Sequence, residues 1–171
     1  MCREDDNEEG KQTITIADKF IHPEYDTPAR ANDVALLKLK EPAIIGPTVS
    51  PACLPDLGDY GDSSSFPEGA SCILTGWGKY GPGEHISGDL YGQPWRLRQV
   101  TLPLVGDEEC SMIYQEGAGF TTQATMQCAG GDGHSACNGD SGGPLVCFKE
   151  DKWFQVTLFK LRLGASMGCF V

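Results

Sequence analysis

Residues 138–144 have the sequence Asn-Gly-Asp-Ser-Gly-Gly-Pro, which combines the residue types that acyl transfer requires. The single serine, Ser141, is flanked by residues that favour tight turns, so its hydroxyl can be presented to a substrate. Backbone N–H groups on such a turn can converge on an oxyanion. A serine hydroxyl is a weak nucleophile near neutral pH and also needs a base. The segment therefore predicts a serine nucleophile that depends on residues elsewhere in the chain.

The composition favours a turn-rich β protein in one domain. The chain has 171 residues, with 22 glycines, 11 prolines and many brief apolar runs. A closed all-β domain often has roughly 200–250 residues, so this chain is short for one. The net charge of -11 argues against nucleic acid or an anionic membrane as a partner. No apolar run is long enough to span a bilayer.

Eight cysteines indicate an oxidising compartment. They form no C-x-x-C pair and no Cys/His cluster, which disfavours zinc sites. Eight cysteines allow about one hundred complete pairings, and spacing alone cannot select one of them. Met1 is followed by Cys2 and an acidic run, which is not the pattern of a signal peptide. We therefore expect an incomplete copy of a secreted protein.

Hydrophobic periodicity predicts mainly antiparallel β structure. Expected strands cover residues 13–16, 34–39, 72–78 and 100–104, and an expected β-hairpin joins 145–148 to 154–158. The strand at 34–39 should have one mostly buried face. One short helix is predicted to begin with Asp107 as its cap and to be ended by Gly117.

Five ordered segments together resemble the chymotrypsin/trypsin family of serine proteases, nearest to its chymotrypsin and pancreatic-elastase branch. The similarity covers roughly residues 12–156, a span in which several boxes at ordered spacing are more specific than one motif. It implies an all-β fold, a trypsin-like double six-stranded antiparallel β-barrel with one short helix. Residues 1–171 would be a single incomplete domain of this kind, with most of the first barrel missing. The five segments are 32–39, 51–55, 75–78, 128–131 and 138–144.

The resemblance implies a role for each matched residue. Ser141 would be the nucleophile, and the backbone N–H groups of Gly139 and Ser141 would form the oxyanion hole. Asp33 would be the buried carboxylate that orients a histidine. Taken alone, Asp33 could equally be a satisfied carboxylate at a strand edge. Asp140 would support the oxyanion loop by pairing with a new amino terminus, and without that ammonium partner its burial would be costly.

The base of this triad is missing from the sequence. No histidine stands in an alanine-alanine-histidine-cysteine box. His22 precedes Asp33 but lies in a turn, and His85 and His134 lie in polar loops, so a structural or solvated role is expected for all three. Without a base, catalysis falls to roughly 10³–10⁴-fold over water. The chain as given is therefore expected to be weak or inactive.

The resemblance assigns Ser135 and Asn138 to the specificity pocket, with Ser135 at its floor. A neutral serine there implies an apolar or aromatic preference. The segment after Val156 departs from the family pattern, because Lys160 and Arg162 replace the small residues expected in the pocket wall.

The resemblance also implies a set of disulfides. Cys53 would pair with a cysteine outside this sequence; Cys2 is an alternative partner, although an unrelated role for Cys2 is the preferred interpretation. The remaining pairs would be Cys72–Cys147, Cys110–Cys128 and Cys137–Cys169.

No cofactor and no metal site are predicted, with one alternative left open. Carboxylates suit calcium, and some family members bind calcium at the position of this acidic run, but a solvated surface run is the default interpretation. The run consists of Glu4, Asp5, Asp6, Glu8 and Glu9.

The function implied by the resemblance is a secreted, monomeric serine endopeptidase. Its partners would be protein or peptide substrates and protease inhibitors. A non-catalytic homologue that binds a partner is the first alternative. A small disulfide-rich binding domain unrelated to proteases is the second.

Overall fold

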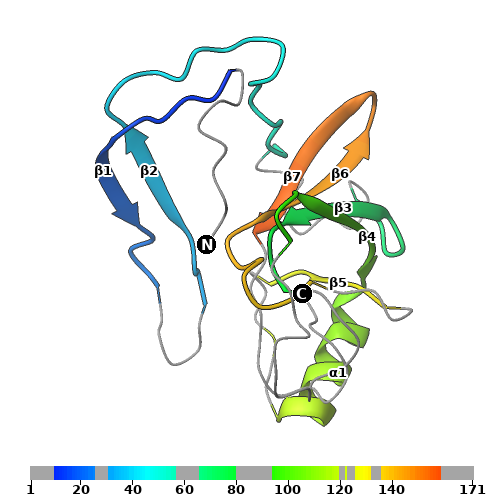
Figure 1. Cartoon of the computed structure of the whole chain (residues 1–171). Coiled ribbons are helices and arrows are strands. Elements are labelled where there is room, and N and C mark those ends of the chain that lie inside the picture. Colours follow the sequence, from blue (N-terminus) through cyan, green and yellow to red (C-terminus); the bar gives the residue numbers. More distant parts are fainter. Residues whose placement is uncertain are drawn as a thin grey trace. The chain divides into compact units, whose positions relative to one another are not determined.

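The computed structural model describes residues 10–25, 31–56, 66–79, 94–119, 122, 126–131 and 136–158 (Figure 1). The chain divides into two compact units, one of them Arg3–Pro51 and the other containing Ala52–Val171. Strands dominate the described residues and one helix accompanies them, as the sequence predicts.

The larger unit contains a curled antiparallel sheet with the strand order β5-β4-β3-β6-β7 (Figure 1). This half-barrel is consistent with the expected trypsin-like fold. Strands β6 and β7 form the hairpin that apolar alternation predicted. The strands are β3 (Ser71–Gly76), β4 (Arg98–Val105), β5 (Cys128–Ala129), β6 (Pro144–Lys149) and β7 (Lys152–Leu158).

One face of this sheet forms the main core. Side chains alternate between the two faces of a strand, so every second residue of β3, β4 and β6 points inward. In the register, Cys72 of β3 lies opposite both Leu102 of β4 and Cys147 of β6. The buried cluster comprises Cys72, Leu74, Leu102, Leu104, Ala129, Ala136, Leu145 and Cys147.

The helix α1 (Asp107–Ala118) is longer than the sequence predicted. Its N-cap is Gly106 and not Asp107, and no side chain caps it. Gly117 does not end the helix, because a glycine inside a helix costs only about 1 kcal/mol. The helix ends at Gly119, whose φ of 60° is the left-handed conformation in which its N–H bonds back to the Gln115 carbonyl.

The smaller unit contains the antiparallel pair β1 (Ile16–Ile21) and β2 (Ala35–Leu39). The prediction of a strand at 13–16 was wrong, because pairing with β2 shifts the strand toward the C-terminus.

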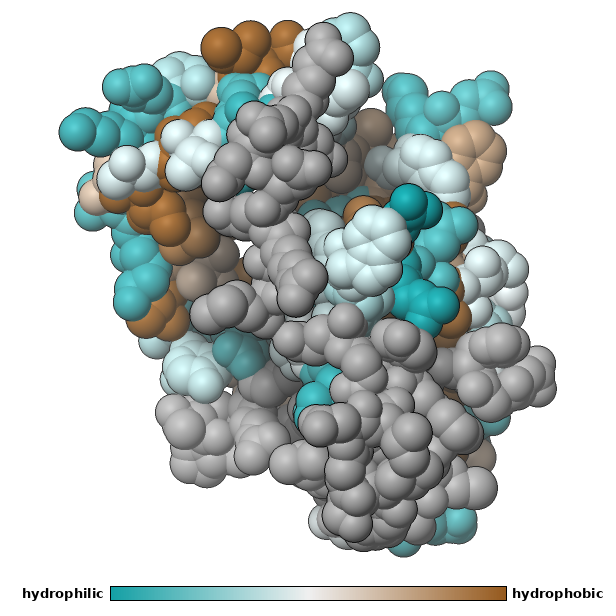
Figure 2. Space-filling model, in the orientation of Figure 1, coloured by the Kyte–Doolittle hydropathy of each residue, from teal (hydrophilic) through white to brown (hydrophobic). Residues whose placement is uncertain are grey.

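The expected buried face of β2 was also wrong. Every residue of β1 and β2 is exposed, with Leu36 71% and Phe20 54% accessible. Figure 2 shows hydrophobic side chains gathered over this pair of strands. Alternation predicts which face is apolar, but burial also needs a second layer, and no described residue supplies one here.

None of the described helices is both long and apolar enough to cross a membrane.

Candidate functional site

The serine segment consists of two consecutive reverse turns. In the first, the Asp140 N–H donates to the Cys137 carbonyl at 3.0 Å, and Gly139 has a φ of 102°. In the second, the Gly143 N–H donates to the Asp140 carbonyl at 2.9 Å, and Gly142 has a φ of 86°. A positive φ at the third position of a turn favours glycine, which explains why both positions are glycine. Ser141 is the second residue of the later turn and is exposed.

The Asp140 carboxylate anchors this double turn to the larger sheet. Its Oδ1 accepts a hydrogen bond from the Gly78 N–H at 2.8 Å, just beyond β3. Its Oδ2 accepts one from the Cys137 N–H at 2.9 Å. The sequence shows no ammonium partner for Asp140, and the structure gives its carboxylate two backbone N–H donors. Hydrogen bonds from backbone N–H groups to a carboxylate are charge-assisted and therefore stronger than those between neutral groups.

Two glycines make room for this carboxylate. A Cβ on Gly78 would lie 2.5 Å from Asp140 Oδ1, and a Cβ on Gly76 would collide with the same oxygen. Both glycines stand at the end of the strand predicted over residues 72–78, and the sequence alone assigns them no role. The signal that could have found them is their spacing, since residues 76 and 78 point to the same side of an extended segment.

The backbone donors predicted for an oxyanion hole, those of Gly139 and Ser141, both belong to the double turn. Asn138, at the start of this turn, is exposed, and its carbonyl accepts a hydrogen bond from the Lys79 N–H at 2.8 Å. Ser135, the predicted pocket floor, lies outside the described residues, as do Lys160 and Arg162.

Asp33, the predicted triad carboxylate, belongs to the smaller unit and lies two residues before the first residue of β2. The structure leaves Asp33 exposed, whereas the triad role predicts burial. Its neighbour Asn32 has a φ of 53° and donates from its side-chain amide to the Glu24 carbonyl at 3.0 Å. This bond ties the start of β2 to the turn after β1.

His22 lies in that turn and has a structural position. Its Nδ1 accepts a hydrogen bond from the Glu24 N–H at 3.1 Å, and its backbone N–H donates to the Val34 carbonyl. Because Nδ1 accepts this hydrogen bond, the proton of the neutral ring is on Nε2. His85 and His134 lie outside the described residues.

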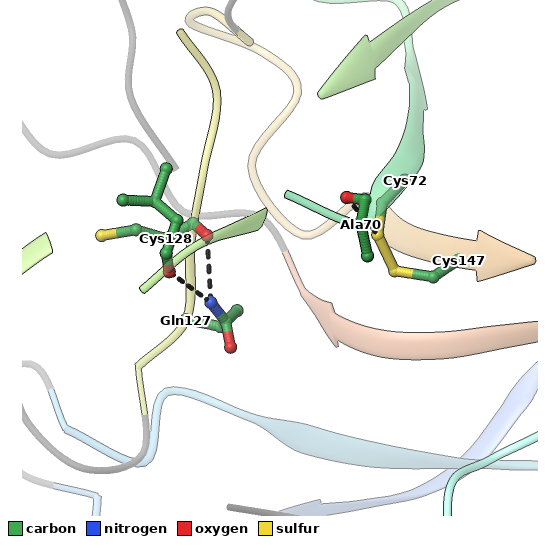
Figure 3. The surroundings of a disulfide bond; sticks show 6 residues. Ala70, Cys72, Gln127, Cys128 and Cys147 are labelled. Carbon is green, nitrogen blue, oxygen red and sulfur yellow. Dashed lines mark hydrogen bonds between the residues drawn. A yellow bond between two sulfur atoms is a disulfide. The ribbon is translucent and has the colours of Figure 1, made fainter. Parts of the chain in front are cut away.

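Two disulfides brace the unit that contains the serine turn. Cys72–Cys147 joins β3 to β6, the strand that follows the serine turn in the sequence. Cys110–Cys128 joins α1 to β5. Figure 3 shows the first disulfide and, beside Cys128, the amide of Gln127, which donates to the carbonyls of Val105 and Cys128.

The other cysteine predictions stay open. The predicted bond from Cys137 to Cys169 falls partly outside the described residues, and Cys2 lies outside them as well. Neither Cys53 nor Cys137 forms a disulfide with another described residue. The backbone of Cys53 pairs with β7, donating to Trp153 and accepting from Gln155.

The acidic run at residues 4–9 also lies outside the described part of the chain, so the calcium alternative stays a prediction. Among the residues that are described, no three His, Cys, Asp or Glu side chains form a metal-binding group.

Comparison with known proteins gives one consistent result. The trypsin family pattern matches residues 3–159. The chain is 35% identical over 158 residues to a tryptase of Mus musculus, an alignment that covers 90% of this chain and 54% of the relative. It is 42% identical over 145 residues to a proproteinase E of Bos taurus, covering 84% of this chain and 52% of the relative. The chain thus spans about half the length of these relatives.

Proposed function

Because this chain belongs to the trypsin family, we propose that it is part of a serine endopeptidase that hydrolyses peptide bonds through an acyl-enzyme at Ser141. The observation that supports this most is the double turn of residues 137–143. It exposes Ser141 while Asp140 ties the turn to Gly78 at the end of β3. Acyl transfer needs this combination of an accessible hydroxyl and fixed neighbouring N–H donors.

In this proposal the reaction proceeds in two steps. The Ser141 oxygen attacks the peptide carbonyl while a base takes its proton. The base then gives that proton to the peptide nitrogen as the C–N bond breaks, so the amine leaves and an ester remains on Ser141. Water then attacks the ester carbonyl, which releases the acid and restores the Ser141 hydroxyl. The N–H groups of Gly139 and Ser141 would stabilise the oxyanion in both steps, each donor being worth about 2.7–4 kcal/mol.

The remaining roles follow from the family. Asp33 would orient the base, although the sequence has no histidine in the family's catalytic box. The residues of this chain alone would then give only weak hydrolysis, roughly 10³–10⁴-fold over water. The neutral Ser135 would favour apolar or aromatic side chains in the substrate.

Proteins and peptides are the proposed substrates, and protease inhibitors that present a peptide to the same serine are further partners. We place the protein outside the cell, acting as a monomer. The two disulfides support this placement, because such bonds persist in oxidising compartments.

The test is hydrolysis of a peptide anilide with phenylalanine before the scissile bond, together with mass spectrometry of the acylated protein. The protein from its native source should release the aniline and gain one acyl group on Ser141. Ser141→Ala should remove both signals, whereas Ser50→Ala, which changes another exposed serine, should retain them. Equal hydrolysis by the Ser141→Ala variant would refute the proposal.

A non-catalytic protease homologue is the second candidate, favoured by the exposed Asp33. It would bind a protein partner without cleaving it. Binding that is retained in Ser141→Ala, with no hydrolysis by the unsubstituted protein, would favour this candidate over the first.

A further inference from the structure

The Asp140 carboxylate fills the space that side chains would occupy at Gly76, the last residue of β3, and at Gly78, two residues further on. An ideal Cβ on Gly76 would overlap Oδ1 and lie 3.0 Å from the carboxyl carbon, and only the Asp140 Cβ, at 3.5 Å, would be an ordinary contact. On Gly78 the Cβ would overlap both oxygens and the carboxyl carbon of Asp140. Neither glycine has a positive φ, so space and not backbone conformation is the reason for glycine here.

The same short segment makes further contacts with the serine turn. The Gly78 N–H binds Asp140 Oδ1 at 2.8 Å, and the Lys79 N–H binds the Asn138 carbonyl at 2.8 Å. Gly143 lies so close to β3 that its Cβ would be 3.1 Å from the Thr75 carbonyl oxygen. Residues 75–79 thus contact the turn at its beginning, middle and end.

We propose that Gly76 and Gly78 are positioning residues for Ser141. By lacking side chains they admit the Asp140 carboxylate to the end of β3, where the Gly78 N–H holds it. The carboxylate in turn fixes the two reverse turns that present Ser141 and its neighbouring N–H groups. The consequence for catalysis rests on the proposed function, but the anchoring of the turn can be measured without it.

A double-mutant cycle with amide hydrogen exchange tests the anchor. Gly76→Ala should displace the carboxylate, and exchange at the Gly78 and Cys137 amides should become roughly ten- to a hundredfold faster, the loss expected for a hydrogen bond to a charged group. In an Asp140→Ala background these bonds are already absent and the remaining contact is at 3.5 Å. There, Gly76→Ala should cause no further change. Gly46→Ala is the matched control, since its Cβ would meet nothing within 4 Å.

The cycle has two results that would overturn the proposal. One is unchanged exchange at both amides in Gly76→Ala. The other is an equal effect of Gly76→Ala with and without the Asp140 carboxylate, which would mean that the glycine serves only the strand. If Gly76→Ala does not fold, Asp140→Asn serves instead, because it keeps the side-chain shape while removing the charge, and it should accelerate exchange at the same amides by roughly tenfold.

A second readout separates this inference from the proposed function. The rate at which a fluorophosphonate modifies Ser141 should fall in Gly76→Ala and Gly78→Ala but not in Gly46→Ala. If the unsubstituted protein is not modified at all, the proposed function fails, while the exchange cycle still decides whether the glycines anchor the turn. Modification that stays equally fast in Gly76→Ala and Gly78→Ala would overturn their positioning role.

Discussion

Removing the two disulfides one at a time should cost this protein unequal amounts of stability. Cys72–Cys147 closes a sequence separation of 75 residues, whereas Cys110–Cys128 closes one of 18. A crosslink restricts the unfolded chain more when its loop is longer. The loop-entropy relation gives about 4.5 kcal/mol for the longer loop and about 3.2 kcal/mol for the shorter one.

The assay is thermal unfolding of two paired variants, Cys72→Ala with Cys147→Ala and Cys110→Ala with Cys128→Ala. The first pair should unfold about 3–5 °C below the second, because the difference of about 1.3 kcal/mol acts on a chain of this size. Cys53→Ala is the control for removal of a sulfur atom alone, since Cys53 forms no disulfide with a described residue.

A lower melting temperature for the variant without Cys110–Cys128 would contradict this expectation. Local packing would then outweigh loop length, and the bond between α1 and β5 would be the main support of the larger unit. All four cysteines of these two bonds are buried.

Three other predictions concern packing and backbone conformation. Leu102→Ala should cost about 2–5 kcal/mol in urea unfolding because the side chain is 0% exposed, and an equal cost for the 53% exposed Leu97→Ala would contradict it. Gly119→Ala should cost about 1–2 kcal/mol, seen as a lower melting temperature by circular dichroism, because its φ is 60°; an unchanged melting temperature would count against this C-cap. Leu36→Lys should lower binding of a hydrophobic dye without lowering stability by more than about 0.5 kcal/mol, since Leu36 is 71% exposed, and unchanged dye binding would show that this strand is covered in solution.

The strands of the larger sheet could be predicted from the sequence because the alternation of apolar residues that marks each strand lies within the strand itself. Leu102 and Leu104 alternate within one strand, and both are buried where β4 meets β3. The extent of α1 could not be predicted in this way. Whether Gly117 or Gly119 ends the helix depends on which of them adopts a left-handed conformation, and both are glycines.

The smaller unit shows what a local pattern lacks. The apolar residues of β2, such as Leu37, predict an inward face, but burial requires a facing layer that the strand itself does not specify. The position of β1 was likewise decided by pairing, with Ile21 opposite Ala35.

The serine turn was predictable in type but not in its support. Its glycines indicate tight turns, and the resemblance assigns Ser141 its role. The partners of Asp140 could not be found, because the Gly78 and Cys137 donors are backbone groups that have no side-chain signature. Only the spacing of Gly76 and Gly78 marked the place where the carboxylate enters.

The most direct test of the account is to find which residue a fluorophosphonate modifies in the protein from its native source. Peptide mass spectrometry after labelling should find the phosphonyl group on Ser141, and Ser141→Ala should abolish labelling and peptide hydrolysis together. Hydrolysis of the apolar peptide with the label on another residue, or hydrolysis that persists in Ser141→Ala, would contradict the assignment of Ser141 as the nucleophile.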